Sequence, residues 1–368
     1  MDTLDRRQWL TALGLAVGGL GASRLVGAER SPAAGPVRLS LNENPFGPAP
    51  GVVDALRAEF SNLCRYTGAE YAALVALIAA RENVPVGQVI LGEILEPLGT
   101  HLSQAGGPGG EFIYSDPGYT ALIDTAVAVG GRAVAVPLNA QLENDLPAIA
   151  AKVNDNTRAV FLVNPHNPTG IVADAQELKA FARRISRQAL VIVDEAYLEF
   201  ADDFAGRTLA ELVRNGDNVI VFRTFAKVFG LGGLDIGYGL VPARIARVLV
   251  AQGLDNPHLF NRLSVAAAAA SLHDKGYVAA VTRKVADERE LWFALFRELK
   301  VRFTPSRGNF VFFETGVPHA EFSASLLREG ILIGRLFAPY DRWARISIGL
   351  PAENALARAA VRRMLLKA

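Results

Sequence analysis

Residues 189–197 read ALVIVDEAY, an apolar run that ends in acidic and aromatic side chains. A short run of this kind, rich in β-branched residues and closed by polar ones, is typical of a buried strand. Similar runs recur along the chain: QVILG (88–92), EFIYSD (111–116), AVFLVNP (159–165) and NVIVFRTFAK (218–227). Longer segments rich in Ala, Leu and Arg, with helical spacing, separate them. This alternation predicts an α/β protein with a largely parallel sheet.

Each of these runs ends in polar or glycine-rich residues, which is where ligands bind in open α/β sheets. Taken singly, these polar residues have ordinary explanations. Asn167 before a proline is typical of a turn, Asp194 could cap a helix, and a lone Lys227 is normally a solvated surface charge. Their order and spacing, with Tyr197 between the last two, point instead to one shared site.

Composition limits the classes of ligand. The chain has 368 residues, 51% hydrophobic and 20% charged, which describes a globular protein with a large core. Lys plus Arg (38) nearly balances Asp plus Glu (37), so no overall charge attracts nucleic acid or an acidic membrane. We therefore expect a small-molecule ligand. Because Cys64 is the only cysteine, the sequence predicts neither an intramolecular disulfide nor a cysteine metal cluster.

The first residues differ from the rest of the chain. Arg6 and Arg7 precede an apolar segment from about residue 10 to residue 20, and Val26-Gly27-Ala28 resembles a signal-peptidase site. The apolar segment is shorter than the roughly 20 residues of a membrane-spanning helix. Residues 1–28 are therefore similar to a twin-arginine signal, with a short frayed helix as the alternative. We expect export to the periplasm through the twin-arginine translocase, without a membrane anchor.

The composition of the sequence changes at about residue 261. There an Ala-rich segment, VAAAAASL (265–272), and a charged helical segment (283–300) precede a mixed α/β tail. This change suggests a second, smaller domain. We expect a large domain over residues 55–260, and a small domain built from residues 29–54 with residues 261–368.

The motifs together resemble the fold-type I pyridoxal-phosphate (PLP) aminotransferases, in particular the histidinol-phosphate aminotransferase-like branch of class I/II. The motifs are LNENPFGP (41–48), CRYTGAEYAALVALIA (64–79), SDPGY (115–119), NPHNPTG (164–170), DEAY (194–197), TFAKVFGLGGLDIGYG (224–239), SRGNFVFF (306–313) and WARISIGLPAEN (343–354). The resemblance implies a large domain with a mostly parallel, seven-stranded type of sheet flanked by helices, a smaller α/β C-terminal domain, and a homodimer. It also implies PLP as the cofactor, and an amino acid and a 2-oxo acid as substrates.

The resemblance also implies roles for the residues at the cofactor ring. Lys227 would bond the cofactor aldehyde through its amine and move protons, because only lysine supplies such a nucleophile. Asp194 would keep the pyridine nitrogen protonated, so that the ring accepts electrons. Tyr197 and Asn167 would hydrogen-bond the phenolate oxygen of the ring, and Tyr119 would stack on its face.

Four further residues are candidate substrate contacts. Arg345 matches the family's clamp for the substrate α-carboxylate, which a planar guanidinium binds better than an ammonium does. Asn42 and Asn44 lie in the segment that covers the substrate in the histidinol-phosphate branch, although an ordinary Asn/Pro loop explains them equally well. Arg335 falls one place later than the family's arginine. An amino acid with an apolar or aromatic side chain is therefore at least as good a candidate as histidinol phosphate.

The chain departs from the family pattern where the cofactor phosphate is held. The usual Ser before the lysine and Arg eight residues after it are Ala226 and Asp235, and the turn before the next helix, LGEILEPLG (91–99), contains Glu93. Two carboxylates would repel a phosphate dianion at close range. Lys227 and its companions nevertheless have no shared purpose without the ring.

Three explanations of this departure stay open. Substitutes could hold the phosphate, namely Thr224 with Tyr66 and Arg262, the last two reaching across a dimer interface; this is the explanation we favour. Alternatively, the pocket has lost PLP and kept its shape. Third, the two carboxylates could point away, or pair with an arginine such as Arg223.

Three other classes of function have some support in the sequence. The glycines of GLGGLDIG (230–237) do not fit the G-x-G-x-x-G pattern of nicotinamide-binding proteins. Another PLP-dependent carbanion enzyme, such as a decarboxylase, lyase, aldolase or racemase, would use the same residues, although Arg345 favours a reaction that keeps the carboxylate. A catalytically silent binding protein on the same scaffold is the alternative from a different class. The sequence predicts a PLP-dependent aminotransferase.

Overall fold

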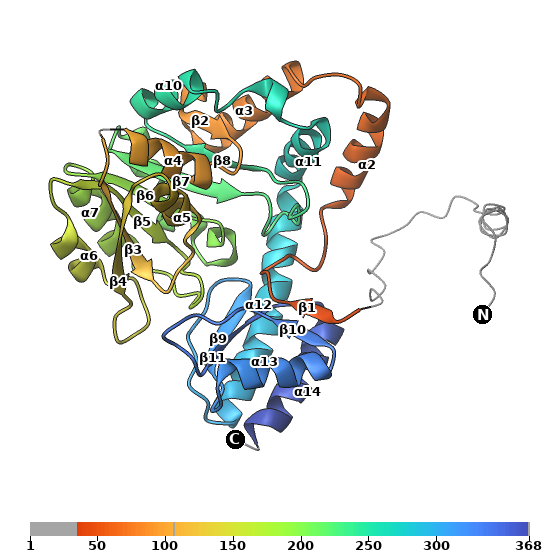
Figure 1. Ribbon diagram of the computed structural model, residues 1–368. Coiled ribbons are helices and arrows are strands. Elements are labelled where there is room, and N and C mark those ends of the chain that lie inside the picture. The colour runs from red at the N-terminus through yellow and green to blue at the C-terminus, as the bar shows by residue number, and fades with distance from the viewer. Residues whose placement is uncertain (1–34, 106, 367–368) are drawn as a thin grey trace, which may run out of the picture. The chain divides into compact units, whose positions relative to one another are not determined.

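A seven-stranded sheet with the order β2-β8-β7-β6-β5-β3-β4 forms the centre of the fold (Figure 1). The computed structural model describes residues 35–105 and 107–366, so the expected signal at residues 1–28 lies outside the described residues. The strands of the sheet are β2 (Val89–Leu91), β3 (Glu111–Asp116), β4 (Arg132–Pro137), β5 (Thr157–Val163), β6 (Leu190–Asp194), β7 (Val219–Thr224) and β8 (Gly237–Leu240). Strands β4, β3, β5, β6 and β7 are parallel to one another, and β8 is antiparallel to both β7 and β2. The expected α/β fold with a mostly parallel sheet is confirmed.

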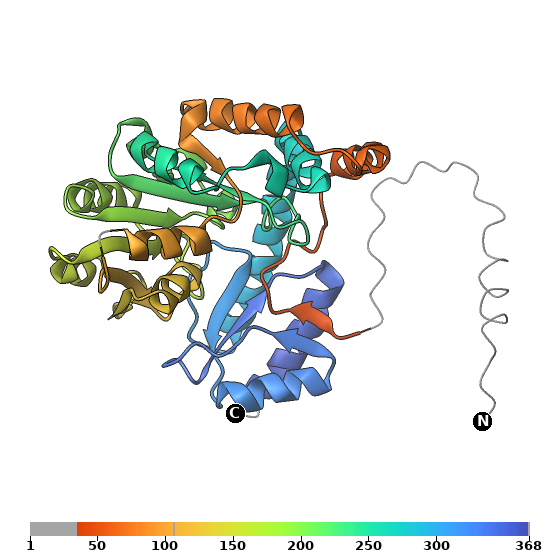
Figure 2. The same cartoon turned by 45° about the horizontal axis from the view of Figure 1, so that its top comes forward.

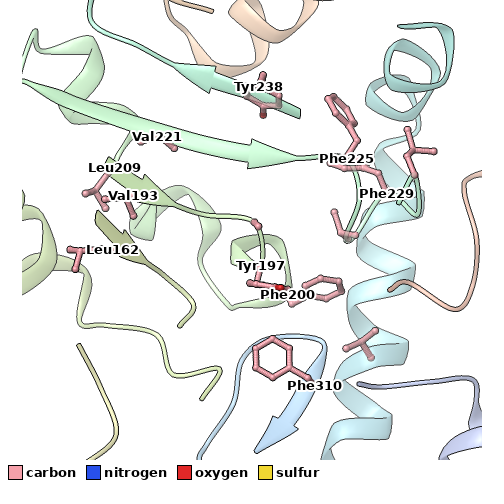
Figure 3. Close-up of a cluster of buried hydrophobic side chains, with 14 of the residues drawn as sticks. Leu162, Val193, Tyr197, Phe200, Leu209, Val221, Phe225, Phe229, Tyr238 and Phe310 are labelled. Carbon is pink, nitrogen blue, oxygen red and sulfur yellow. The ribbon is translucent and has the colours of Figure 1, made fainter. Parts of the chain in front are cut away.

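Strand β6 shows why these strands read as almost continuous apolar runs. Val191 and Val193 pack into the core on one face of the sheet, whereas Leu190 and Ile192 pack into a second core on the other face. Because alternate side chains point to opposite faces, a strand covered on both sides needs apolar residues throughout. Figure 3 shows part of the first core, in which Leu162, Val193 and Val221 of three neighbouring strands lie together.

Helices cover both faces of the sheet (Figure 1). The α-helices are α2 (Pro50–Glu59), α3 (Ala69–Glu82), α4 (Leu95–Gln104), α5 (Ala121–Ala128), α6 (Leu146–Lys152), α7 (Ala175–Ile185), α8 (Phe204–Arg207), α9 (Ala210–Arg214), α10 (Ala243–Ala251), α11 (Arg262–His273), α12 (Lys275–Glu298), α13 (His319–Arg328) and α14 (Pro351–Leu365). Short 3₁₀ turns are η1 (Phe60–Asn62), η2 (Val86–Gln88), η3 (Leu198–Phe200) and η4 (Pro257–Leu259). Helices α4, α5 and α10 contribute to the second core, and α3, α7 and α9 to the first.

Two small sheets form the rest of the fold. β1 (Val37–Leu39) pairs in parallel with β10 (Ile331–Ile333), and β9 (Phe310–Glu314) pairs antiparallel with β11 (Trp343–Ser347). In Figure 2 these sheets lie together with α13 and α14, with β1 in red among the blue C-terminal elements. Helix α11, however, packs against α2 and α3. The domain boundaries drawn from the sequence stay a prediction.

No helix in residues 35–105 and 107–366 is long and apolar enough to cross a membrane. In the same residues, no cluster of His, Cys, Asp or Glu side chains could hold a metal ion.

Candidate active site

Three neighbouring parallel strands bring the predicted ring-binding residues to one edge of the sheet. β6 ends at Asp194, β7 ends three residues before Lys227, and Asn167 follows β5. In the strand register, Asp194 is paired with Val163 and Phe222. Because these strands are parallel, their carboxyl ends meet, as expected for a ligand site of an α/β sheet.

Asp194 is the buried acid of this site. Its side chain is only 3% exposed, and one carboxylate oxygen accepts a hydrogen bond from the Ala196 backbone amide at 2.9 Å. Burial raises the pKa of Asp194 to about 7, although the Ala196 amide and the charge of Lys227 lower it. Its second oxygen has no hydrogen-bond partner among the described residues. A buried carboxylate with a free oxygen suits a protonated ring nitrogen, which would compensate its charge.

Lys227 faces the N-terminal segment and Tyr197. Its Nζ lies 3.4 Å from the Leu41 carbonyl oxygen and 5.7 Å from the centre of the Tyr197 ring. The loop that carries Lys227 packs closely on this segment at Gly230, which has φ of +73°. A Cβ there would lie 2.4 Å from the Gly47 carbonyl oxygen. Only glycine fits this position without a change in the backbone, so the close packing of the loop on the segment depends on Gly230.

Tyr197 and Asn42 join the sheet edge to the small sheets. The Tyr197 hydroxyl accepts a hydrogen bond from Asn42 Nδ2 at 3.2 Å, and its ring meets Phe310 edge-on at 5.2 Å (Figure 3). Asn42 Oδ1 accepts a hydrogen bond from Ser347 Oγ at 3.0 Å, and the Asn42 carbonyl oxygen accepts one from Asn309 Nδ2 at 2.9 Å. Asn42 is therefore held from both sides, beside Tyr197.

Asn44, predicted as a substrate contact, is placed differently. Its Nδ2 donates to the Val228 carbonyl oxygen at 2.8 Å and to the Tyr277 hydroxyl at 3.0 Å, and its Oδ1 accepts from the Phe46 amide. These bonds use both Nδ2 hydrogens and one of the two acceptor positions of Oδ1. In this structure Asn44 fixes the N-terminal segment against the Lys227 loop, and its role as a substrate contact stays a prediction.

Arg345 is a buried cation without a carboxylate partner among the described residues. It is 7% exposed and donates to Asn167 Oδ1 and to the Ser40 carbonyl oxygen, both at 2.6 Å. Its Nε is buried and makes no hydrogen bond. Burial lowers the pKa of Arg345 to about 10, so it still carries its charge at neutral pH. An unpaired buried guanidinium is costly, and an anionic ligand would compensate it.

Two more predicted residues lie at the edge of this site. The Arg335 guanidinium stacks 4.4 Å from the centre of the Phe337 ring, and Arg345 lies 5.0 Å from the centre of the same ring. Arg335 NH2 also lies 3.4 Å from the Gly118 carbonyl oxygen, next to Tyr119. Burial raises the pKa of Tyr119, and the nearby charges of Asp194 and Glu93 raise it further. Tyr119 is thus within electrostatic reach of both acids.

Glu93 occupies the end of the site at which the cofactor phosphate was expected. Thr224 Oγ1 donates to Glu93 Oε1 at 2.6 Å and accepts a hydrogen bond from the Ala226 amide at 3.0 Å. Burial raises the pKa of Glu93 to about 7, and Asp194 and Asp235 raise it further. Thr224, predicted as a substitute phosphate ligand, is therefore already bonded to a carboxylate.

The other predicted phosphate ligands are not brought to Lys227 in this chain. Arg262 is 8% exposed and forms ion pairs with Glu59 (3.0 Å) and Glu70 (2.7 Å). It also donates to the Tyr66 carbonyl oxygen at 2.9 Å, while the Tyr66 side chain is 78% exposed. The guanidinium of Arg262 is thus bonded to groups of its own chain, and its role across a dimer interface stays a prediction.

The suggested pairing of Glu93 or Asp235 with Arg223 is wrong. Arg223 is 1% exposed and pairs with Glu82 at 2.8 Å and Glu195 at 3.0 Å. This buried network lies behind Asp194 and Thr224, the neighbours of Glu195 and Arg223 in sequence. The sequence patterns did not predict this network. The available signal was a charged residue at each of these two strand ends, inside runs that are otherwise apolar.

The residues fit the two halves of PLP unequally. On the ring side, the free oxygen of Asp194, the amine of Lys227 and the hydroxyl of Tyr197 supply what the ring needs. On the phosphate side, Glu93 and Asp235 stand where donors and a cation would be required, and no Lys or Arg forms an ion pair with either in residues 35–105 and 107–366. The ring fits, and the phosphate does not.

The chain belongs to the aminotransferase class I and II family, whose model matches residues 34–362. The histidinol-phosphate aminotransferase 2 of Pseudomonas fluorescens strain Pf-5 is 37% identical over 339 residues, 90% of each chain. That of Moorella thermoacetica is 32% identical, over 89% of this chain and 85% of the relative. The solved histidinol-phosphate aminotransferase of Sinorhizobium meliloti, in complex with pyridoxal 5′-phosphate, has a TM-score of 0.80 at 31% identity, covering 90% of this chain and 91% of that one. The predicted family and fold type are confirmed, and the chain is a PLP-dependent aminotransferase.

Proposed function

We propose that this aminotransferase transfers an amino group to a 2-oxo acid from a donor whose anionic group is bound by Arg345. The observation that carries this proposal is the buried Arg345 guanidinium, which has no carboxylate partner among the described residues and lies against Asn167. An amine donor with an anion at this point would present its amino group to the strand ends that carry Lys227 and Asp194.

Asp194, Lys227 and Tyr197 have different roles in the proposed reaction. When bound, PLP supplies an electron-accepting ring and an aldehyde that takes up the amino group. Asp194 would hold the proton at the ring nitrogen, and Lys227 would remove and return the proton at the donor carbon. Tyr197 keeps its hydroxyl beside Asn42, under the N-terminal segment. This cover would exclude water from the reacting carbon.

Two donor chemistries fit the anion site. The relatives are named histidinol-phosphate aminotransferases, and Arg335 next to Arg345 would suit a phosphate monoester. An α-amino acid would use Arg345 for its carboxylate and leave Arg335 at the exposed edge. Histidinol phosphate and a panel of amino acids are therefore both used as amino donors in the test.

The test uses the visible absorbance of the protein without and with added PLP. A cofactor band that bleaches with a donor, followed by borohydride reduction and peptide mapping to Lys227, would support the proposal. A band that no amine donor bleaches would favour another PLP reaction. Absence of any band in excess PLP would identify a silent scaffold and overturn the proposal.

Substitution of Arg345 tests the anion site. We expect Arg345→Ala to raise the donor KM about 100-fold or more, because two charge-assisted hydrogen bonds contribute about 1.5 to 3 kcal/mol each. Arg345→Lys should recover part of the loss. Arg342→Ala, an exposed arginine that bonds the Gly316 carbonyl oxygen, is the matched control. A donor KM within threefold of the unsubstituted enzyme would remove Arg345 from the site.

We also propose that the enzyme is a homodimer. The exposed apolar side chains of Phe60, Leu63, Tyr66 and Leu259, here called the Tyr66 surface, lie on η1, η4 and the loop after η1. Tyr66 meets His258 edge-on at 5.1 Å, which joins the two parts of the surface. Such a cluster is typical of an interface. Light scattering should give twice the chain mass, and Leu63→Asp should reduce it; a monomer at micromolar concentration would contradict the proposal.

Export is the third proposal, and it is supported by sequence alone. Arg6 and Arg7 before an apolar segment resemble a twin-arginine signal. Cell fractionation should find the protein in the periplasm, and Arg6→Lys with Arg7→Lys should retain it in the cytoplasm. An unchanged distribution would exclude this route.

A further inference from the structure

The 5′ end of the cofactor site carries a carboxylate that the fold accommodates closely. Glu93 Oε1 accepts a hydrogen bond from Thr224 Oγ1 at 2.6 Å. A Cβ on Gly237, the first residue of β8, would lie 2.9 Å from the same oxygen, so the backbone there leaves room for this carboxylate. Glu93 is therefore closely fitted between Thr224 and Gly237, and its charge and that of Asp235 act on each other there.

The N-terminal end of helix α4 also favours a negative charge at Glu93. Backbone amides at the start of a helix favour an anion, which is how many proteins bind phosphate. Glu93 lies two residues before α4, and Glu96 lies in its first turn. The chain thus supplies its own anions at this helix end, and a phosphate dianion would have to displace or approach them.

The residues at the end of the neighbouring strand β6 suit a pyridine ring. Asp194 is 97% buried, since it is only 3% exposed, and one of its oxygens has no partner among the described residues. Lys227 and Tyr197 lie beside it. Strand β7, the neighbour of β6, ends at Thr224, whose hydroxyl bonds Glu93. A ring held by Asp194 and Lys227 would therefore have Glu93 near its 5′ substituent.

We propose that the 5′ end of this site is built for an uncharged hydroxymethyl group, so that the enzyme binds the unphosphorylated vitamers pyridoxal and pyridoxamine about as well as PLP. The 5′-hydroxyl donates a hydrogen bond to Glu93. A carboxyl group pairs with a hydroxyl whether it is ionised or protonated, but only its protonated form tolerates a phosphate. The inference rests on the proposed placing of the ring at Asp194 and Lys227.

Equilibrium titrations with PLP and with pyridoxal, followed by tryptophan fluorescence and calorimetry at pH 8, test the proposal. We expect the two dissociation constants of the unsubstituted protein to lie within tenfold of each other, or pyridoxal to bind more tightly. Pyridoxine and pyridoxine 5′-phosphate lack the aldehyde and cannot form a covalent bond with Lys227. The ratio of their dissociation constants should equal that of pyridoxal and PLP, because each pair differs only at the 5′ end.

Two variants should change this ratio in favour of the phosphate. Glu93→Gln removes one charge, and Asp235→Arg introduces a cation at an exposed position; each should improve PLP over pyridoxal by about tenfold or more. Glu321→Gln, with the same loss of charge in the exposed first turn of α13, is the matched control and should change the ratio less than twofold. Should Glu93→Gln fail to fold, Asp235→Arg still carries the test.

Two results would overturn the proposal. One is a preference of the unsubstituted protein for PLP of more than tenfold, and the other is a ratio that neither variant changes. If PLP binds tightly and pyridoxal does not, only this inference fails, and the aminotransferase with PLP stands. If neither vitamer binds, the placing of the ring fails as well, and with it the proposed function.

Discussion

Lys227→Ala should lower the kcat of amino transfer by about 10⁴-fold or more. The amine of Lys227 has two tasks, as the nucleophile that holds the cofactor and as the acid and base at the donor carbon, and proton transfer alone is worth about 10² to 10⁴. The charge of Lys227 also lowers the pKa of both Asp194 and Glu93. Single-turnover kinetics with added PLP would measure the loss.

The controls for this variant separate chemistry from folding. Lys284→Ala removes a lysine that lies over the Phe46 ring of the N-terminal segment, and should keep kcat within about twofold. Lys227→Arg keeps the positive charge but not the nucleophile, and should be as inactive as Lys227→Ala. Small primary amines added to Lys227→Ala should restore part of the rate. A kcat within tenfold of the unsubstituted enzyme would exclude Lys227 as the catalytic base.

Asp194→Asn should lower kcat by about 10³-fold. The reason is that an amide cannot hold a proton at the ring nitrogen as a buried carboxylate does, so the ring loses most of its ability to accept electrons. Asp194→Glu, which keeps the charge, should retain more of the rate. Steady-state kinetics and the position of the cofactor absorbance band measure the two effects.

The stability of the same variant distinguishes a catalytic role from a structural one. The folded pKa of Asp194 is raised from 3.8 to about 7, so folding binds a proton between these values and the stability of the apoprotein falls as pH rises through this range. Asn carries no charge to bury. Asp194→Asn should therefore be at least as stable as the unsubstituted apoprotein at pH 8 in thermal unfolding. A large loss of stability together with the loss of rate would indicate a structural role.

The strands and the ring-binding residues could be predicted because their signals are local. Asp194 and Lys227 each stand next to an apolar run that reads as a buried strand, and the sheet then brings them together. Strands β4 and β8 were not predicted. β8 is short and glycine-containing, and its pairing with β2 and β7 depends on contacts across the chain.

The partners of the charged residues could not be predicted. Arg223 meets Glu82 across 141 positions, and Arg262 meets Glu59 across 203 positions. No periodicity or spacing encodes such pairs. The sequence therefore suggested Arg223 as a partner for Glu93, whereas Arg223 pairs with Glu82 and Glu195. The bonds of Asn44 to Val228 and Tyr277 likewise come only with the fold.

The N-terminal segment has a consequence for the order in which the protein assembles during synthesis. Residues 157–227 contain the strand ends that carry Asn167, Asp194 and Lys227. The cover over them depends on Val37 pairing with Ile331 and on Asn42 meeting Ser347, 305 positions away. A ribosome releases those partners late, and contacts of such separation form slowly. In the nascent chain these strand ends would thus stay uncovered until the region around Ser347 has emerged.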